Sequence, residues 1–233
     1  PRTMSRLTGV ARCTLLLCAL SCSVCRKEKR QRQTMDRTAA EAWLSQLGVP
    51  SDLKELPVRY GHFATVEKEV RGAESYFSKD APWMDDKPKV KWTFNHNPDK
   101  KYALMAVDPD TPEPASDGDG TKVGEFGPWM NWFVLNCKDT AASGHVVYPY
   151  EAPNPTTDKA HRVVFILFEQ LRPGKLQGFI GVDRMNWDFE GFLRENKEAL
   201  KPVAMNFLYV TGTPHSDDAA GSIPTDYDEH DEL

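Results

Sequence analysis

Two continuous apolar runs, Ala103–Val107 and Val163–Phe168, constrain the fold more than any other feature of this sequence. A strand with one face in water alternates apolar and polar residues, whereas a strand covered on both faces is apolar throughout. The two runs therefore predict central strands of a sheet that has a protein layer on each side. Shorter runs between proline-rich and acidic loops predict further strands at Val90–Phe94, Trp132–Asn136, Val146–Tyr148 and Phe207–Val210. The domain is expected to be mainly β, with peripheral helices.

Two helices are expected outside this sheet. The first is predicted to begin at the capping-box spacing Thr38-x-x-Glu41 and to end at Gly48, and the second to be capped by Asp188. Each should present one apolar face to the sheet. The apolar faces comprise Trp43, Leu44 and Leu47 in the first helix, and Phe189, Phe192, Leu193 and Leu200 in the second.

Three polar clusters lie at the ends of predicted strands. Asp108-Pro109-Asp110-Thr111-Pro112 follows the first apolar run, His161-Arg162 precedes the second, and Trp129–Asn136 lies between them. If the clusters converge, they bring an acid, an imidazole, an amide and an aromatic wall to one pocket, which is a common composition for a small-ligand site. A carboxylate beside an imidazole can hold a proton between them, so Asp108 and His161 could donate to a phosphate or carboxylate oxygen. Alternatives stay open: Asp108 could cap a turn by accepting from backbone amides, and His161 and Trp129 could be ordinary core residues.

A resemblance to a known family rests on the same motifs. Over roughly Leu47–Thr211, the chain resembles the phosphatidylethanolamine-binding protein family, which includes the Raf kinase inhibitor, the carboxypeptidase Y inhibitor and plant flowering regulators. The family pattern is Asp-Pro-Asp-x-Pro, then Trp-x-His before a strand ending in Asn, then His-Arg opening a strand that ends near Glu-Gln. These motifs correspond here to residues 108–112, 129–136 and 161–170, and the family's second pocket histidine is Asn131. The resemblance implies a Greek-key β-sandwich with peripheral helices.

The resemblance also implies a role for each site residue. The expected ligand-binding residues are Asp108, Pro112, Trp129, Asn131, Pro153 and His161. Asp110 and Arg162 face each other in the family, so they are expected to form a structural ion pair that holds two loops in register. On this interpretation Asp108 faces water in the pocket and contributes little to stability, whereas Asp110 and Arg162 support the fold.

The function expected on these grounds is non-catalytic binding of a small anion, such as a phospholipid headgroup or a phosphorylated ligand. The alternative is a protein inhibitor that acts through its surface on a serine protease or a kinase.

The sequence contains no catalytic motif: it has no nucleophile elbow, zinc-helix motif, P-loop or dinucleotide fingerprint. Cys137 follows the strand that ends at Asn136, far from the pocket. Neither a cofactor nor a metal is expected, since Asp117-Gly118-Asp119-Gly120 lacks the ligand register of a calcium loop. A net charge of −5 argues against a nucleic-acid partner.

The two ends of the chain suggest a compartment. Residues 1–34 are expected to be a leader and basic linker, because the apolar stretch Cys13–Val24 follows Met4 and is too short to span a bilayer, so no transmembrane segment is expected. Residues 35–213 should form the binding domain, in which Cys137 is left without a disulfide partner. Residues 214–233 form an acidic tail that ends in a retention signal, His230–Leu233. Together these features predict the endoplasmic reticulum lumen, whereas translation from Met35 would give a cytoplasmic protein.

Overall fold

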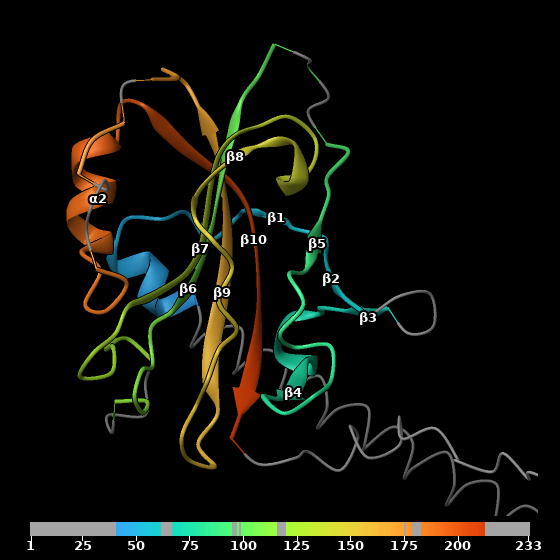
Figure 1. The fold of residues 1–233 in the computed structure, drawn as a ribbon. Coiled ribbons are helices and arrows are strands. Elements are labelled where there is room, and N and C mark those ends of the chain that lie inside the picture. Colours follow the sequence, from blue (N-terminus) through green and yellow to red (C-terminus); the bar gives the residue numbers. More distant parts are fainter. Residues whose placement is uncertain are drawn as a thin grey trace, which may run out of the picture.

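The strands form one large sheet and one small sheet (Figure 1). The computed structural model describes residues 41–61, 67–94, 97, 99–115, 120–174, 176–178 and 183–212. The large sheet has the strand order β1-β10-β9-β6-β7-β8, with β4 also paired to β10, and the small sheet has the order β3-β2-β5. The strands are β1 Lys54–Glu55, β2 Val58–Tyr60, β3 Lys68–Glu69, β4 Tyr76–Ser78, β5 Lys89–Val90, β6 Tyr102–Asp108, β7 Trp129–Cys137, β8 His145–Tyr148, β9 His161–Gln170 and β10 Leu200–Thr211.

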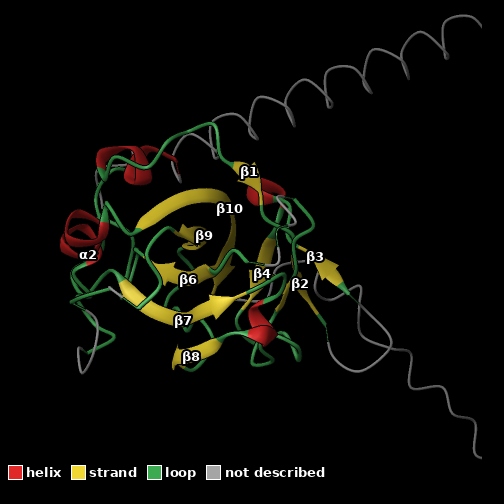
Figure 2. Ribbon diagram, turned by 90° about the horizontal axis from the view of Figure 1, so that it is seen from above, coloured by secondary structure: helices red, strands yellow, loops and turns green. Residues whose placement is uncertain are grey.

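The middle strands of the large sheet are covered on both faces, as the apolar runs predict. Every residue of β6 is buried, and in β9 only Glu169 is less than buried. Val163, Phe165 and Leu167 belong to the apolar cluster shared with the small sheet, whereas the alternate residues of β9 pack in the cluster under the helices. Figure 2 shows the large sheet between the helices on one side and β2 and β3 on the other. The mainly β class with peripheral helices is confirmed, and the Greek-key connectivity stays a prediction.

The helices lie on one face of the large sheet (Figure 1). Residues 41–46 are helical, and the helix ends at Gly48, whose positive φ of 74° is the conformation that glycine adopts without strain at a helix C-terminus. The amide of Val49 donates to the Leu44 carbonyl at 3.0 Å and closes this end. Thr38, the expected first cap, lies outside the described residues. Helix α2, Phe189–Asn196, begins as predicted: the Asp188 carboxylate accepts from the Gly191 amide at 2.8 Å.

The prediction that Leu200 belongs to the second helix is wrong. Helix α2 ends at Asn196, whose side-chain amide donates to the Phe192 carbonyl at 2.8 Å, and Leu200 is the first residue of β10. The Leu171 amide binds the Ala199 carbonyl at 2.8 Å, so pairing with the end of β9 draws this segment into the sheet. Leu200 nevertheless packs in the same apolar cluster as Phe192, because the start of β10 lies beside the helix.

Strand boundaries differ from prediction where the apolar pattern is weak. The closing strand predicted at Phe207–Val210 extends back to Leu200, past a register shift between Pro202 and Ala204. The strand predicted at Val90–Phe94 is only Lys89–Val90, followed by an isolated bridge at Lys91. Strands β1 to β4 were not predicted, because two or three residues are too few to show an alternating pattern. The leader, the acidic tail and residues 116–119, which include most of the Asp117–Gly120 segment, lie outside the described residues.

Candidate functional site

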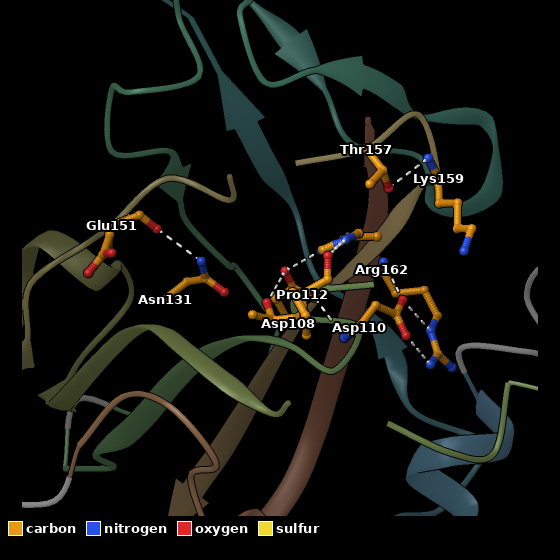
Figure 3. A network of polar contacts seen from close by, with 10 residues as sticks. Asp108, Asp110, Pro112, Asn131, Glu151, Thr157, Lys159 and Arg162 are labelled. Carbon is orange, nitrogen blue, oxygen red and sulfur yellow. Dashed lines mark hydrogen bonds and ion pairs between the residues drawn. The ribbon is translucent and has the colours of Figure 1, made fainter. Parts of the chain in front are cut away.

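The first and third polar clusters meet where the end of β6 lies beside the start of β9. These strands pair antiparallel, with Val107 opposite Val164, so Asp108 at the end of β6 is carried next to His161 at the start of β9. The turn that contains Asp110 and Pro112 then folds over the same point (Figure 3). The convergence expected from the sequence is therefore produced by the register of two buried strands.

The Asp108 carboxylate is a buried hub. One oxygen accepts from the Asp110 amide at 2.8 Å, and the other accepts from the Thr111 hydroxyl at 2.9 Å and lies 2.8 Å from His161 Nδ1. Asp108 thus caps the turn and also pairs with the imidazole, whereas its role in ligand binding stays a prediction. The expectation that it faces water is wrong, because Asp108 is 2% exposed.

Both ring nitrogens of His161 face acceptors. Nδ1 faces Asp108, and Nε2 lies 3.1 Å from the Pro112 carbonyl oxygen. A neutral imidazole carries only one N–H, so this arrangement matches the doubly protonated ring. Burial lowers the pKa of His161, but the hydrogen bond and the negative charge of Asp108, with smaller effects of Asp110 and the Pro112 carbonyl, outweigh it and raise the pKa above its ordinary value. The site therefore favours an imidazolium.

The Asp110–Arg162 pair is bidentate and buried. One Asp110 oxygen accepts from the Arg162 amide at 2.7 Å and from Nε at 2.8 Å, while the other accepts from Nη2. The same guanidinium donates to the backbone carbonyls of Gly120 and Lys122. Burial lowers the pKa of Arg162, but the hydrogen bond and charge of Asp110 raise it overall. One side chain thus joins the turn after β6, the 120–122 segment and the start of β9.

Asn131 lies beside this hub without hydrogen-bonding to it. Its side-chain amide donates to the Glu151 carbonyl at 3.1 Å, and the Glu151 amide donates to the Asn131 carbonyl at 2.8 Å (Figure 3). The side-chain oxygen of Asn131 is buried and has no hydrogen-bond partner within the described part of the chain. Trp129 is half-buried opposite Asp108 in the β6–β7 register, and Pro153 is buried in the segment between β8 and β9.

Comparison with known proteins identifies the family of this chain. The family model of the phosphatidylethanolamine-binding protein matches residues 53–208. The chain belongs to this family. A curated relative, the protein FLOWERING LOCUS T of Arabidopsis thaliana, is 36% identical over 86 residues, which are 34% of this chain and 45% of that protein. The chain therefore aligns with less than half the length of that curated relative.

Two solved structures are similar in fold. A carboxypeptidase Y inhibitor, solved in complex with its cognate proteinase, shares 17% identity at a TM-score of 0.55, covering 79% of this chain and all of that one. A phosphatidylethanolamine-binding protein of Plasmodium falciparum shares 18% identity at a TM-score of 0.49, covering 73% of this chain and 95% of that one. At 17% identity, the similarity to the carboxypeptidase Y inhibitor describes the fold alone.

Several contacts of this family member's site were not predicted. The acceptor for His161 Nε2 is a backbone carbonyl, that of Pro112, and sequence motifs do not report backbone atoms. Arg184 donates to the carbonyls of Met130 at 2.7 Å and Pro149 at 2.9 Å, and its Nε lies 3.1 Å from a Glu151 carboxylate oxygen. Arg184 thus ties the start of β7 to the segment that contacts Asn131. It precedes α2 in a loop, and no motif of the sequence marks it.

Other chemical possibilities find no support in the described residues. Cys137 is fully buried at the far end of β7, and burial raises the pKa of its thiol to about 12, so a thiolate nucleophile is disfavoured. Among the residues described, no group of histidine, cysteine and acidic side chains is placed to hold a metal ion. Likewise, no helix in the described part of the chain has the length and apolar character needed to cross a bilayer.

We expect Arg162→Ala to lower the free energy of unfolding by about 3–5 kcal/mol, because it leaves the Asp110 carboxylate buried without its partner. The double variant Asp110→Ala/Arg162→Ala should lose less than the sum of the two single variants, because no unpaired charge remains. Urea unfolding of the four proteins measures this coupling. The matched control is Arg59→Ala, since Arg59 has a side chain 51% exposed in its ion pairs and should cost little. Equal losses for Arg162→Ala and Arg59→Ala would contradict the proposed scaffold role.

Proposed function

We propose that this member of the family binds a small anionic ligand, a phospholipid headgroup or a phosphorylated molecule, at Asp108 and His161. The observation that carries the proposal is the contact of His161 Nε2 with the Pro112 carbonyl at 3.1 Å. A charged N–H donor held against a neutral backbone acceptor can exchange that acceptor for an anionic oxygen, which forms the stronger hydrogen bond. The Pro112 carbonyl then marks the position that a ligand oxygen would take.

The proposed mechanism is an exchange of acceptors without chemical turnover. When the Pro112 carbonyl alone turns aside, His161 Nε2 is released while Nδ1 keeps its contact with Asp108. Asp108 remains anchored by the Asp110 amide and the Thr111 hydroxyl, so the imidazolium keeps its orientation. The half-buried indole of Trp129, opposite Asp108, supplies an apolar wall for the ligand stem. Asn131 adds an uncharged polar group, so His161 supplies the titrating positive charge.

We expect anion binding to strengthen as the pH falls through a single transition. Because the pKa of His161 is raised, the imidazolium should be fully formed below about 6.5 and should be lost only as the pH rises through a higher value. Calorimetric titration with phosphorylethanolamine from about pH 6 to about pH 9 measures this dependence. Sulfate is the control ligand, because it keeps its charge over this range.

Three variants separate the contributions to this binding. His161→Gln should lose about 1.5–3 kcal/mol, the scale of a charge-assisted hydrogen bond, and should remove the pH dependence. Asp108→Asn should move the transition to lower pH and weaken binding near neutral pH, because the imidazole loses the charged partner that raises its pKa. Asn131→His should tighten binding more at about pH 6 than at about pH 8, because it adds a second protonatable ring. If His161→Gln binds as well as the parent chain at every pH, this site is not the anion site.

A second candidate function is inhibition of a serine protease through the protein surface, and an exposed apolar pair favours it. Phe126 is 39% exposed and Met185 is 40% exposed, and the Asn186 amide binds the Phe126 carbonyl at 3.0 Å, so the two loops lie together. The loop of Phe126 is fixed beside the site, because its amide donates to the Thr111 carbonyl at 3.0 Å. Gly127, the residue after Phe126, packs directly against the Pro109 carbonyl, where a Cβ would clash. The Phe126 loop can therefore approach the turn after β6 this closely only with glycine at this position.

The two candidate functions predict opposite responses to mutation. If the chain inhibits carboxypeptidase Y, Phe126→Ser/Met185→Ser should weaken inhibition by about tenfold or more, because it removes exposed apolar contacts. His161→Gln should leave that inhibition intact. Assay of peptidase activity against increasing concentrations of each variant decides this. No inhibition by the parent chain, or equal inhibition by the double-serine variant, would contradict this second function.

We propose the lumen of the endoplasmic reticulum as the compartment in which this chain acts. The support is the pairing of an apolar leader after Met4 with the terminal His230–Leu233. Deletion of the last four residues should move an internally tagged protein into the medium, because the retention receptor no longer binds it. Immunoblotting of medium and cell fractions measures the change, with a scrambled terminal sequence as the matched control. Uniform cytosolic staining of the full chain would contradict this proposal.

A further inference from the structure

A groove separate from the Asp108–His161 site lies between the two helical segments and the start of β10. It has a volume of about 580 Å³, within the range of about 300–1,000 Å³ that is usual for small-molecule sites. Figure 1 shows the 41–46 helix and α2 on the same face of the large sheet, with the beginning of β10 beside α2. The groove is formed by the segment after the first helix, by α2, by the end of β9 and by the start of β10.

The groove is distant from the first site. Phe168, which lines it, follows His161 by seven residues on β9, or about 23 Å along the strand at about 3.3 Å per residue. An odd separation also places the two side chains on opposite faces of the sheet. Phe168 accordingly packs in the cluster beneath the helices. A ligand in the groove and a ligand at His161 would therefore not touch.

The lining of the groove is apolar and open to solvent. Its apolar side chains come from four separate parts of the chain, with the buried Phe168 as their base: Leu47 and Val49, Leu193, Phe168 and Leu171 at the end of β9, and Leu200 at the start of β10. Leu171 is 50% exposed, and Leu47 and Leu193 are only partly buried. Apolar side chains that converge on a concave, open surface differ from scattered surface leucines, because together they leave a continuous wall for an apolar ligand.

The rim of the groove is positively charged. Arg194 and Lys197 lie three residues apart at the end of α2, and Lys201 joins them from β10, whereas Glu190 is the carboxylate in the lining. All three cationic residues are exposed, and within the described ranges none of them forms an ion pair. The chain as a whole carries a net charge of −5, so three cations around one groove do not reflect a generally basic surface.

We propose that this groove binds a single-chain anionic amphiphile, with its acyl chain on the leucine wall and its head group at Arg194, Lys197 and Lys201. The apolar wall provides burial for a chain without polar atoms, and the three cations complement one negative charge. A neutral amphiphile would gain only the apolar contact.

The test uses the full chain and a fluorescent long-chain carboxylate, cis-parinarate, below its micelle concentration, with its methyl ester as the uncharged counterpart. The parent chain should bind the carboxylate more tightly than the ester. Arg194→Gln/Lys197→Gln/Lys201→Gln should weaken carboxylate binding by about tenfold and leave ester binding unchanged. These residues are exposed, so the variant is expected to fold as the parent does.

Two controls make the result specific. Lys89→Gln/Lys91→Gln/Lys138→Gln removes the same charge from exposed positions that do not line the groove and should leave both probes unaffected. Leu171→Ser should weaken the carboxylate and the ester alike, because it removes part of the apolar wall. Inorganic phosphate should not displace the carboxylate, and this result would distinguish binding in the groove from binding at His161.

The proposal is overturned if the parent chain binds neither probe, if phosphate displaces the carboxylate, or if both triple variants bind the carboxylate equally well.

Discussion

The ion pair between Asp110 and Arg162 holds the parts of the site together. A buried carboxylate and a buried guanidinium are costly when unpaired, so the turn after β6 and the start of β9 must stay in contact for the chain to fold. The guanidinium also donates to the carbonyls of Gly120 and Lys122, which fixes a third segment. Asp108 precedes Asp110 by two residues, and His161 precedes Arg162 by one. Their 2.8 Å contact therefore follows from a scaffold that is stabilised by neighbouring residues.

Burial strengthens the interaction with Asp108 that favours the protonated form of His161. His161 and Asp108 are both shielded from water, so their mutual attraction is stronger than it would be at the surface, and it outweighs the desolvation that opposes an imidazolium. Asn131 lies beside this pair and cannot take a proton (Figure 3). Its buried side-chain oxygen has no hydrogen-bond partner among the described residues, which leaves a neutral acceptor next to the imidazole.

The sequence predicted those parts of the structure that depend on local pattern. Continuous apolar runs identified β6 and β9, and Asp188 identified the start of α2, because burial on two faces and helix capping are expressed within a few residues. Convergence of the motifs was predictable because each lies at a strand end. The sequence did not predict that Asp108 is buried or that His161 Nε2 contacts the Pro112 carbonyl. Both features depend on how a turn folds over the sheet. Leu200 was misplaced for a related reason: its pairing partner lies thirty residues away, at Gln170.

Strand β9 runs between two groups of basic side chains that lie in different environments. At its start, His161 and Arg162 are buried and each is paired with a carboxylate, and salt in the solvent screens such buried pairs weakly. Beyond its end, Arg194, Lys197 and Lys201 are exposed and form no ion pair within the described residues, and salt screens them strongly. Protonation therefore governs the charge of His161, whereas ionic strength governs the attraction that the exposed cations exert. Because apolar clusters pack on both faces of the sheet between them, the two groups respond to pH and to salt separately.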